Sequence, residues 1–509
     1  MELDGEKVAD RATLETDLCI VGAGPAGLVL AGELAKGRHD VVLLESGGHR
    51  PEPAILALND GVVVGDEYAG LRQTRHRQLG GTSAIWNTPV QGAIGAKYAP
   101  LDAYDLDARP GREGSGWPVS YAELLPYYAR AQQRCGLGPF AYEAESWSDP
   151  PVVPFRLAGS ALVSRVYQLG SRDSLVAPIL GTLRRESNVR SYTHATVVRL
   201  ETGRSRTGVL RAVVGSPGGA RWSVHAERFV LAAGAVENAR LLLSSGEPPG
   251  LGNEAGWVGR CFMEHPRDGA LFLHPRSPTL YEEAAFYDLR QARDGTAVLG
   301  RLALSGDVLR SDALLNASAT LFPVLRPAAR RARAALGPLA RSRAGEHWLP
   351  RGGHGWLRHP APARVFAGFT LLLNLEQSPH PENRVVLGPR RDALGVPMPE
   401  LHWRWRPEDE ARLQKLRAVV AHTLVESGLG RVETLRESRP NPNAHHHAGT
   451  TRMSANPAHG VVDANGRVHS LDNLFVAGAS VFPTAGFANP TLTIVALTLR
   501  LADHMGRTT

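Results

Sequence analysis

Three consecutive histidines near the C-terminal end of the chain are the first residues whose types suggest chemistry. His445, His446 and His447 stand directly before the run Ala-Gly-Thr-Thr-Arg-Met. Three imidazoles could bind a metal ion, lie in a solvated loop, or include one histidine that acts as a general base. Adjacent side chains do not easily converge on one ion, and no acidic residue accompanies them at ligand spacing, so we predict no metal site.

A polar residue also stands at the start of an expected C-terminal helix. The segment from Asn473 onward reads as a strand, a turn of small residues and a helix that starts near Pro490, where a missing N–H is tolerated. Asn489 directly precedes this proline. The positive end of the helix dipole could stabilise negative charge on a bound group at this point.

A glycine loop near the N-terminus predicts dinucleotide binding. Gly22, Gly24 and Gly27 form Gly-x-Gly-x-x-Gly between an apolar strand that begins at Asp17 and a run with helical period. Such a loop lets backbone N–H groups and a helix N-terminus approach a pyrophosphate. Glu45 ends the next apolar run, where a carboxylate would accept hydrogen bonds from ribose hydroxyls. The alternative is a glycine loop that serves only the close packing of helix and strand.

The elements that must position these residues follow from the apolar patterns. The N-terminal strand, helix and strand form a βαβ unit, with Asp17 as the start of the first structured element. Residues 120–131 show a helical pattern, and residues 188–230 read as hairpins. Residues 326–365 are rich in Arg, Ala, Pro and Gly, and we expect an insertion that is helical at first and then loop-like.

The composition is that of a globular protein of two or three domains, with 509 residues, 43% hydrophobic and 21% charged. A net charge of +7 would admit a polyanionic partner, but the basic residues are almost all scattered arginines, so we predict no nucleic-acid binding. Three widely spaced cysteines form no disulfide framework, which favours a reducing compartment. With no signal-peptide pattern and no apolar run of membrane length, we expect a cytoplasmic protein without a membrane span.

In their order along the chain, the motifs resemble those of the glucose–methanol–choline (GMC) oxidoreductases, FAD enzymes that oxidise alcohols and sugars. The resemblance covers nearly the whole chain. It includes Gly-Gly-Thr-Ser at 80–83, Ser-Gly-Trp-Pro at 115–118, Val-Leu-Ala-Ala-Gly-Ala at 230–235, Val-Gly-Arg-Cys-Phe-Met-Glu-His-Pro at 258–266 and Glu-Asn-Arg-Val-Val-Leu at 382–387. The C-terminal His-x-x-Gly-Thr and Asn-Pro-Thr motifs are the most specific.

The resemblance implies roles for the residues of both C-terminal motifs. His446 stands three residues before Gly449, which makes it the implied catalytic base, and Asn489 is the implied second catalytic residue. His445 and His447 would alternate to the other side of an extended segment. The implied cofactor-binding residues are Gly22, Gly24, Pro25, Ala26, Gly27, Glu45, Gly80, Gly81, Thr82, Ser83, Asn87, Val197, Gly478, Ala479, Pro490 and Thr491. FAD should be bound non-covalently, because Ile85 precedes Trp86 where the pyranose oxidases carry a flavin-linked histidine.

The implied fold is α/β with an α+β substrate part. A Rossmann-like FAD domain would comprise residues 1–100, 190–270 and 455–509, residues 101–189 would connect and cover the flavin, and a substrate domain on an antiparallel sheet would comprise residues 271–454.

The implied reaction is oxidation of CH–OH to C=O on a sugar, glycoside, aminoglycoside or nucleoside, by hydride transfer to flavin N5 with His446 as base. Oxygen or another carrier would accept the electrons. Two alternatives are a flavin monooxygenase, which shares the βαβ unit, and a flavin-containing RNA-binding protein. The sequence leaves the oligomeric state open.

Overall fold

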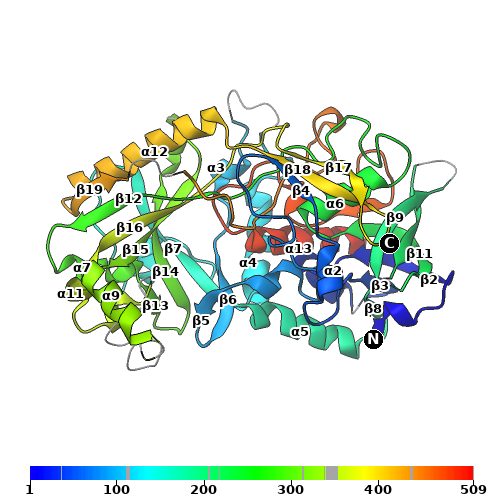
Figure 1. Ribbon diagram of the computed structural model, residues 1–509, viewed down its shortest axis with the longest axis horizontal. Helices are drawn as coiled ribbons and strands as arrows, with labels where there is room; N and C mark the ends of the chain where they lie inside the picture. Colours follow the sequence, from blue (N-terminus) through cyan, green and yellow to red (C-terminus); the bar gives the residue numbers. More distant parts are fainter. Residues whose placement is uncertain are drawn as a thin grey trace.

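The computed structural model describes residues 1–35, 37–109, 115–203, 207–216, 218–311, 314–337, 339, 354–435 and 439–507. Within these residues the strands form a mixed sheet of eight strands, an antiparallel sheet of nine and a small sheet of three. The mixed and antiparallel sheets lie at opposite ends of the long axis of the molecule, and both chain termini lie beside the mixed sheet (Figure 1).

The mixed sheet is the predicted Rossmann-like unit. Its order is β1-β8-β3-β2-β11-β10-β9, with β20 beside β11. Strands β1, β8, β3, β2, β11 and β20 run parallel to one another. Strand β10 pairs antiparallel with β11, and β9 pairs antiparallel with β10. The bounds are β1 Glu2–Asp4, β8 Val189–Thr193, β3 Val41–Leu44, β2 Thr13–Val21, β11 Arg221–Leu231, β10 Val209–Gly215, β9 Thr196–Thr202 and β20 Leu474–Val476. The predicted hairpins between residues 188 and 230 are confirmed as β9, β10 and β11.

The antiparallel sheet has the order β19-β12-β16-β15-β14-β7-β6-β5, with β13 beside β14. The bounds are β19 Gly430–Thr434, β12 Arg267–Pro275, β16 Phe366–Leu375, β15 Ala317–Leu325, β14 Ala297–Leu304, β7 Leu162–Ser171, β6 Ala93–Tyr98, β5 Thr88–Val90 and β13 Leu289–Gln291. Its membership departs from the expected 271–454, because β5, β6 and β7 join it through β14. Hydrogen bonding between distant strands decides which sheet a strand enters, and the local pattern carries no such information.

The small sheet pairs strands from distant parts of the chain. Strands β17 Arg384–Arg391 and β18 Pro397–Trp403 form a hairpin, and β18 pairs in parallel with β4 Val62–Gly65. The helices are α1 Pro25–Leu34, α2 Pro53–Ala57, α3 Ala103–Leu106, α4 Tyr121–Arg134, α5 Arg172–Arg185, α6 Ala235–Ser244, α7 Leu280–Glu283, α8 Gly306–Ser311, α9 Pro327–Leu336, α11 Pro362–Val365, α12 Pro407–Glu426 and α13 Thr491–Arg507. Among the described helices, none has the length and apolar character needed to cross a bilayer.

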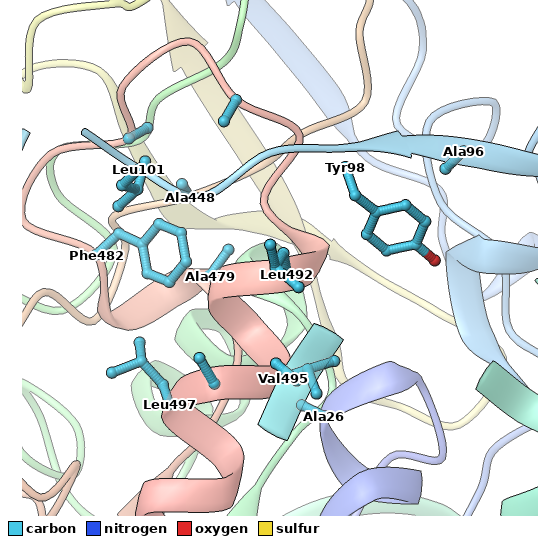
Figure 2. Packing of buried hydrophobic residues seen from close by; sticks show 14 of the residues in the cluster. Ala26, Ala96, Tyr98, Leu101, Ala448, Ala479, Phe482, Leu492, Val495 and Leu497 are labelled. Carbon is cyan, nitrogen blue, oxygen red and sulfur yellow. The ribbon is translucent and has the colours of Figure 1, made fainter. Parts of the chain in front are cut away.

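Helix α13 packs against α1 of the N-terminal βαβ unit. Leu492 and Val495 of α13 are fully buried and lie close to Ala26 of α1 and to Ala479 (Figure 2). The predicted helices at 120–131 and after Pro490 are confirmed as α4 and α13. Burial of the apolar stripe of α13 therefore brings the C-terminal motif to the glycine loop.

Two sequence expectations differ from the structure or fall outside it. The first structured element is not the strand at Asp17, because β1 pairs with β8 at the sheet edge and β2 already begins at Thr13. These N-terminal residues are charged and half exposed, so they carry no apolar run. The insertion at 326–365 begins with α9, but much of its expected loop-like part, residue 338 and residues 340–353, lies outside the described residues.

In the turn between β2 and α1, glycine is required at position 27 more strictly than at position 24. A Cβ on Gly27 would lie 1.9 Å from the carbonyl oxygen of Gly22, whereas a Cβ on Gly24 would have its nearest neighbour, the Cα of Gly81, at 4.0 Å. Gly27 therefore allows the first turn of α1 to pack onto the glycine loop.

We predict that Gly27→Ala lowers the free energy of unfolding by about 1–3 kcal/mol, the usual cost of overpacking. The matched variant Gly24→Ala should change it little, because its methyl group meets open space. Chemical denaturation of the ligand-free protein followed by circular dichroism measures both. Equal destabilisation of the two variants would contradict the packing role of Gly27.

Candidate active site

A cavity of about 360 Å³ lies between the mixed and antiparallel sheets. Residues from both ends of the chain line it, and it is within the size range of small-molecule sites. The sequence-predicted residues in its lining are Gly22, Gly24, Pro25, Ala26, Glu45, Gly81, Thr82, Ser83, Asn87, Val197, His446, Gly478, Ala479, Asn489, Pro490 and Thr491. The fold thus brings the glycine loop, the second small-residue loop and both C-terminal motifs to one place.

Two predicted cofactor residues stand behind the cavity wall. Gly27 is buried against Gly22, as described above. Gly80 has a φ of 92°, a conformation that favours glycine, and its N–H donates to the carbonyl oxygen of Ala23 at 2.9 Å. Both residues shape the loops, and neither lines the cavity.

Glu45 ties the end of β3 to the glycine loop. Its Oε2 accepts a hydrogen bond from the N–H of Ala23 at 2.9 Å, and its Oε1 accepts one from the N–H of Gly47 at 3.0 Å. Burial raises the pKa of this carboxyl group. Each oxygen keeps further acceptor capacity toward the cavity, which suits a ribose hydroxyl.

Backbone hydrogen bonds fix the histidine segment between the two sheets. Met263 and Ala448 exchange hydrogen bonds as an antiparallel bridge, and the N–H of Gly449 donates to the carbonyl oxygen of Ala479. A Cβ on Gly449, whose φ is 89°, would lie 2.1 Å from the carbonyl oxygen of Cys261. The Gly-Thr pair therefore marks a close crossing of chain segments, and the Oγ1 of Thr450 anchors it by donating to the carbonyl oxygen of Ala235 at 2.6 Å.

The ring of His446 is held by a second histidine. The two Nδ1 atoms of His446 and His265 lie 3.0 Å apart, and Nε2 of His265 lies 3.1 Å from the carbonyl oxygen of Ala485. A carbonyl only accepts, so Nε2 of His265 carries the proton. Burial lowers the pKa of His265 to about 4, so its Nδ1 is a bare acceptor at neutral pH. His446 must then donate from Nδ1, which leaves its Nε2 as a proton acceptor.

The surroundings of His446 keep this acceptor unprotonated. Burial is the largest cause that holds its pKa well below the ordinary 6.5, and the positive charges of Arg267 and Lys97 lower it further. The main-chain N–H of His446 donates to Glu264 Oε2 at 3.0 Å. His446 is thus a neutral, oriented base that lines the cavity.

His447 faces a separate polar group. Its Nε2 lies 2.9 Å from the hydroxyl of Tyr68, which donates to Glu264 Oε1 at 2.7 Å. His445 has a φ of 63°, a left-handed conformation that interrupts the extended segment expected from the sequence. The three side chains therefore do not alternate between two sides of the segment, and all three histidines line the cavity. Because His446 and His447 have different partners, they do not point at a common centre.

Asn489 lies in the cavity wall, two residues before helix α13 begins at Thr491. Its side-chain amide has no hydrogen-bond partner among the described residues, so it can donate to a bound group. The N-terminus of α13 adds a favourable field for negative charge at the same place.

Several cavity residues escaped the sequence reasoning. Arg75 and Arg77 line the cavity and both pair with Glu237, at 2.6 Å for Arg77. Lys97 and Arg267 also line it, without such a partner among the described residues. His265 and Glu264 belong to the Glu-His-Pro motif quoted for the family resemblance, but nothing in their spacing indicates that they meet His446.

Comparison with known proteins shows what this chain is similar to. The family model described as GMC oxidoreductase matches residues 379–498, and the NAD(P)-binding Rossmann-like domain matches residues 20–50. The chain is 27% identical to paromamine 6'-oxidase of Streptomyces fradiae, covering 96% of this chain and 90% of that protein. It is 25% identical to 6'''-hydroxyparomomycin C oxidase of Streptomyces lividus, covering 96% and 92%. It is also 25% identical to the fructose dehydrogenase large subunit of Gluconobacter japonicus, covering 96% and 98%.

Solved structures share the fold at lower identity. Pyridoxine 4-oxidase from Mesorbium loti has a TM-score of 0.54 at 18% identity, with 96% of this chain and 98% of that chain covered. A formate oxidase variant from Aspergillus oryzae RIB40 has a TM-score of 0.57 at 18% identity, covering 98% and 99%. The predicted Rossmann-like α/β fold is confirmed.

The two threonines after Gly449 offer a matched test of how the histidine segment is anchored. Both are fully buried, but Thr450 donates to Ala235, whereas the Oγ1 of Thr451 has no partner among the described residues. We predict that Thr450→Val lowers the free energy of unfolding by about 0.5–1.5 kcal/mol, the net value of one hydrogen bond. Thr451→Val should be neutral or stabilising. Denaturant unfolding of both variants checks this, and a larger loss for Thr451→Val would contradict it.

Proposed function

The chain belongs to the GMC oxidoreductases, FAD-dependent enzymes that act on alcohol groups, and from this premise we propose that it oxidises a hydroxyl of a polyol ring with His446 as the base. The observation that carries the proposal is the contact between Nδ1 of His446 and Nδ1 of His265, because it leaves the other ring nitrogen of His446 ready to accept a proton.

The cavity fits FAD along its length. The open turn at Gly24 and the start of α1 suit the pyrophosphate, and Glu45 suits a ribose. The small residues Gly81 to Ser83 allow a planar ring to approach the backbone, opposite the histidine segment and the start of α13. Bound FAD supplies the ring system that takes up the two electrons of the alcohol. Non-covalent attachment remains a prediction.

The proposed work of the protein is to position the alcohol and to move its proton. Nε2 of His446 accepts the hydroxyl proton as negative charge develops on the alcohol oxygen. The resulting positive charge on the ring is shared through Nδ1–H with His265. Asn489 donates its amide N–H to the same oxygen, which stabilises the developing negative charge.

The polyol ring as substrate is supported by the relatives, whose names describe them as acting on paromamine, hydroxyparomomycin C and fructose. Either oxygen or another carrier could reoxidise the cofactor, and we propose oxygen because two of these relatives are named oxidases. A cytoplasmic location is also proposed, supported by three free and buried cysteines. The division into an FAD domain and a substrate domain is kept as a proposal, with β5, β6 and β7 assigned to the substrate sheet.

We predict that His446→Ala binds FAD but slows anaerobic flavin reduction by about 10²- to 10⁴-fold, the usual contribution of a positioned base. Asn489→Ala should slow it by about 10²- to 10³-fold, because a donor to developing charge is lost. The control His445→Ala removes a neighbouring imidazole without a hydrogen-bond partner among the described residues, so it should be much milder.

Stopped-flow absorbance measures these rates, and His447→Ala is measured beside them. Equal losses in His445→Ala, His446→Ala and His447→Ala, or reversal by a chelator, would favour a metal site. Loss only in His447→Ala would move the base to the next residue.

The low pKa of His446 predicts the pH dependence of flavin reduction. The reactive form is the neutral ring, and burial together with nearby cations lowers the pKa of His446 well below 6.5. The neutral form therefore persists as the pH falls through 6.5, and the rate constant should stay level there and decline only at more acidic pH. Stopped-flow reduction across this range tests the expectation, and a half-maximal rate at or above pH 6.5 would contradict it.

A further inference from the structure

Two cations without carboxylate partners stand at the histidine end of the cavity. Lys97 of β6 and Arg267 of β12 both line it, and among the described residues neither forms an ion pair. They share this lining with His446, the proposed base, and their charges lower its pKa. Glu45, at the other end of the cavity, is influenced instead by Arg77.

The other cations of the cavity are partly neutralised. Arg75 and Arg77 share the buried carboxylate of Glu237, and their attraction lowers its pKa against the opposing effect of burial. One carboxylate offsets one of these two positive charges. Lys97 and Arg267, in contrast, are the side chains whose positive charges lower the pKa of His446.

Strand geometry and packing direct Lys97 toward the cavity. Tyr98 points into the buried cluster (Figure 2), so Lys97, one residue earlier, faces the other side of β6. Its Nζ lies 5.0 Å from the centre of the Tyr167 ring, and the guanidinium of Arg301 also lies 5.0 Å from that centre. Burial, together with the positive charges of Arg267 and Arg301, lowers the pKa of Lys97 to about 8, so the amine stays mainly protonated at neutral pH.

Carboxylates in the region do not cancel this charge. Asp102 and Glu143 act on Arg301, but both are paired with Arg165, at 2.5 Å for Asp102. Glu264, on which Arg267 also acts, does not line the cavity, and burial raises its pKa to about 7, so it is ionised only in part at neutral pH. The wall of the antiparallel sheet that faces His446 is therefore positive.

We propose that the substrate is an anionic polyol, a sugar bearing a carboxylate or a phosphate, whose negative group is bound by Lys97 and Arg267 while a ring hydroxyl meets His446. This inference rests on the proposed function. An amino sugar such as those named for the paromomycin-related enzymes would bring a like charge against both cations. The structure thus favours a substrate charge opposite to that of these relatives' substrates.

The test uses sugars that share one ring and differ in charge. D-glucose, D-glucosamine, D-glucuronate and D-glucose 6-phosphate are titrated into the FAD-loaded enzyme by calorimetry, and the same sugars are tested for anaerobic flavin bleaching. The variants are Lys97→Met and Arg267→Met, with Lys415→Met on the exposed face of α12 as the matched control. Comparison of glucuronate with glucose 6-phosphate separates a carboxylate from a phosphate.

We expect an anionic sugar to bind at least tenfold more tightly than glucose, with glucosamine the weakest. Lys97→Met and Arg267→Met should each lose about tenfold of the anion's affinity, about 1.4 kcal/mol, and added salt should weaken binding in the wild type. Lys415→Met should behave as the wild type. Binding of glucosamine as tight as that of the anions, no binding of either anion, or unchanged affinity in both variants would overturn the inference.

The two proposals fail in different ways. Bleaching by glucose or glucosamine without preference for an anion would support alcohol oxidation and overturn the anion site. Charge-dependent binding of an anionic sugar without bleaching by any sugar would support the anion site and count against polyol oxidation. If Lys97→Met or Arg267→Met slows only the reoxidation of the reduced enzyme, the cations act in reoxidation rather than in substrate binding, and the inference is overturned.

Discussion

A buried carboxylate with three hydrogen-bond donors determines the geometry of the candidate site. Glu264 is fully buried, and a carboxylate removed from water is stable only where donors replace its hydration. Its Oε2 accepts from the N–H groups of His265 and His446, and its Oε1 accepts from Tyr68. These donors come from three distant parts of the sequence. The hydrogen bonds to this one carboxylate therefore bring His446, His265 and the Tyr68 hydroxyl to fixed positions. Burial raises the pKa of Glu264 to about 7.

The segment that carries His446 belongs to neither large sheet, and both hold it. On one side, Met263 and Ala448 form a bridge just before β12 begins. On the other side, Gly449, Thr451 and Met453 donate main-chain hydrogen bonds to residues 479–481, which precede α13. The base is thus placed by main-chain bonds rather than by its own side chain.

The sequence predicted the strand, turn and helix units that line the cavity because their signals are local. A strand, a glycine turn and a helix follow one another at 13–34, and the strand, turn and helix near the C-terminus do the same. The membership of β5, β6 and β7 in the antiparallel sheet was not predictable, since pairing across more than a hundred residues leaves no local pattern.

The candidate base was predicted from a resemblance, but the reason for its protonation state was not. The contact between His265 and His446 joins residues 181 positions apart. The same holds for the cations of the cavity: Lys97 reads as an ordinary strand residue, and only the fold shows that no carboxylate among the described residues meets it.

Because the mixed sheet is assembled from both ends of the chain, the parts of the cavity wall are synthesised at very different times. Strand β2 and the glycine loop leave the ribosome early, but β20 and α13, which complete the same cavity, are made after all the other described elements. Until then the apolar face of α1 that meets α13 has no partner from the C-terminal segment. The cavity is therefore complete only once the C-terminal segment has been made, and until then the N-terminal unit keeps apolar surface without its C-terminal partner.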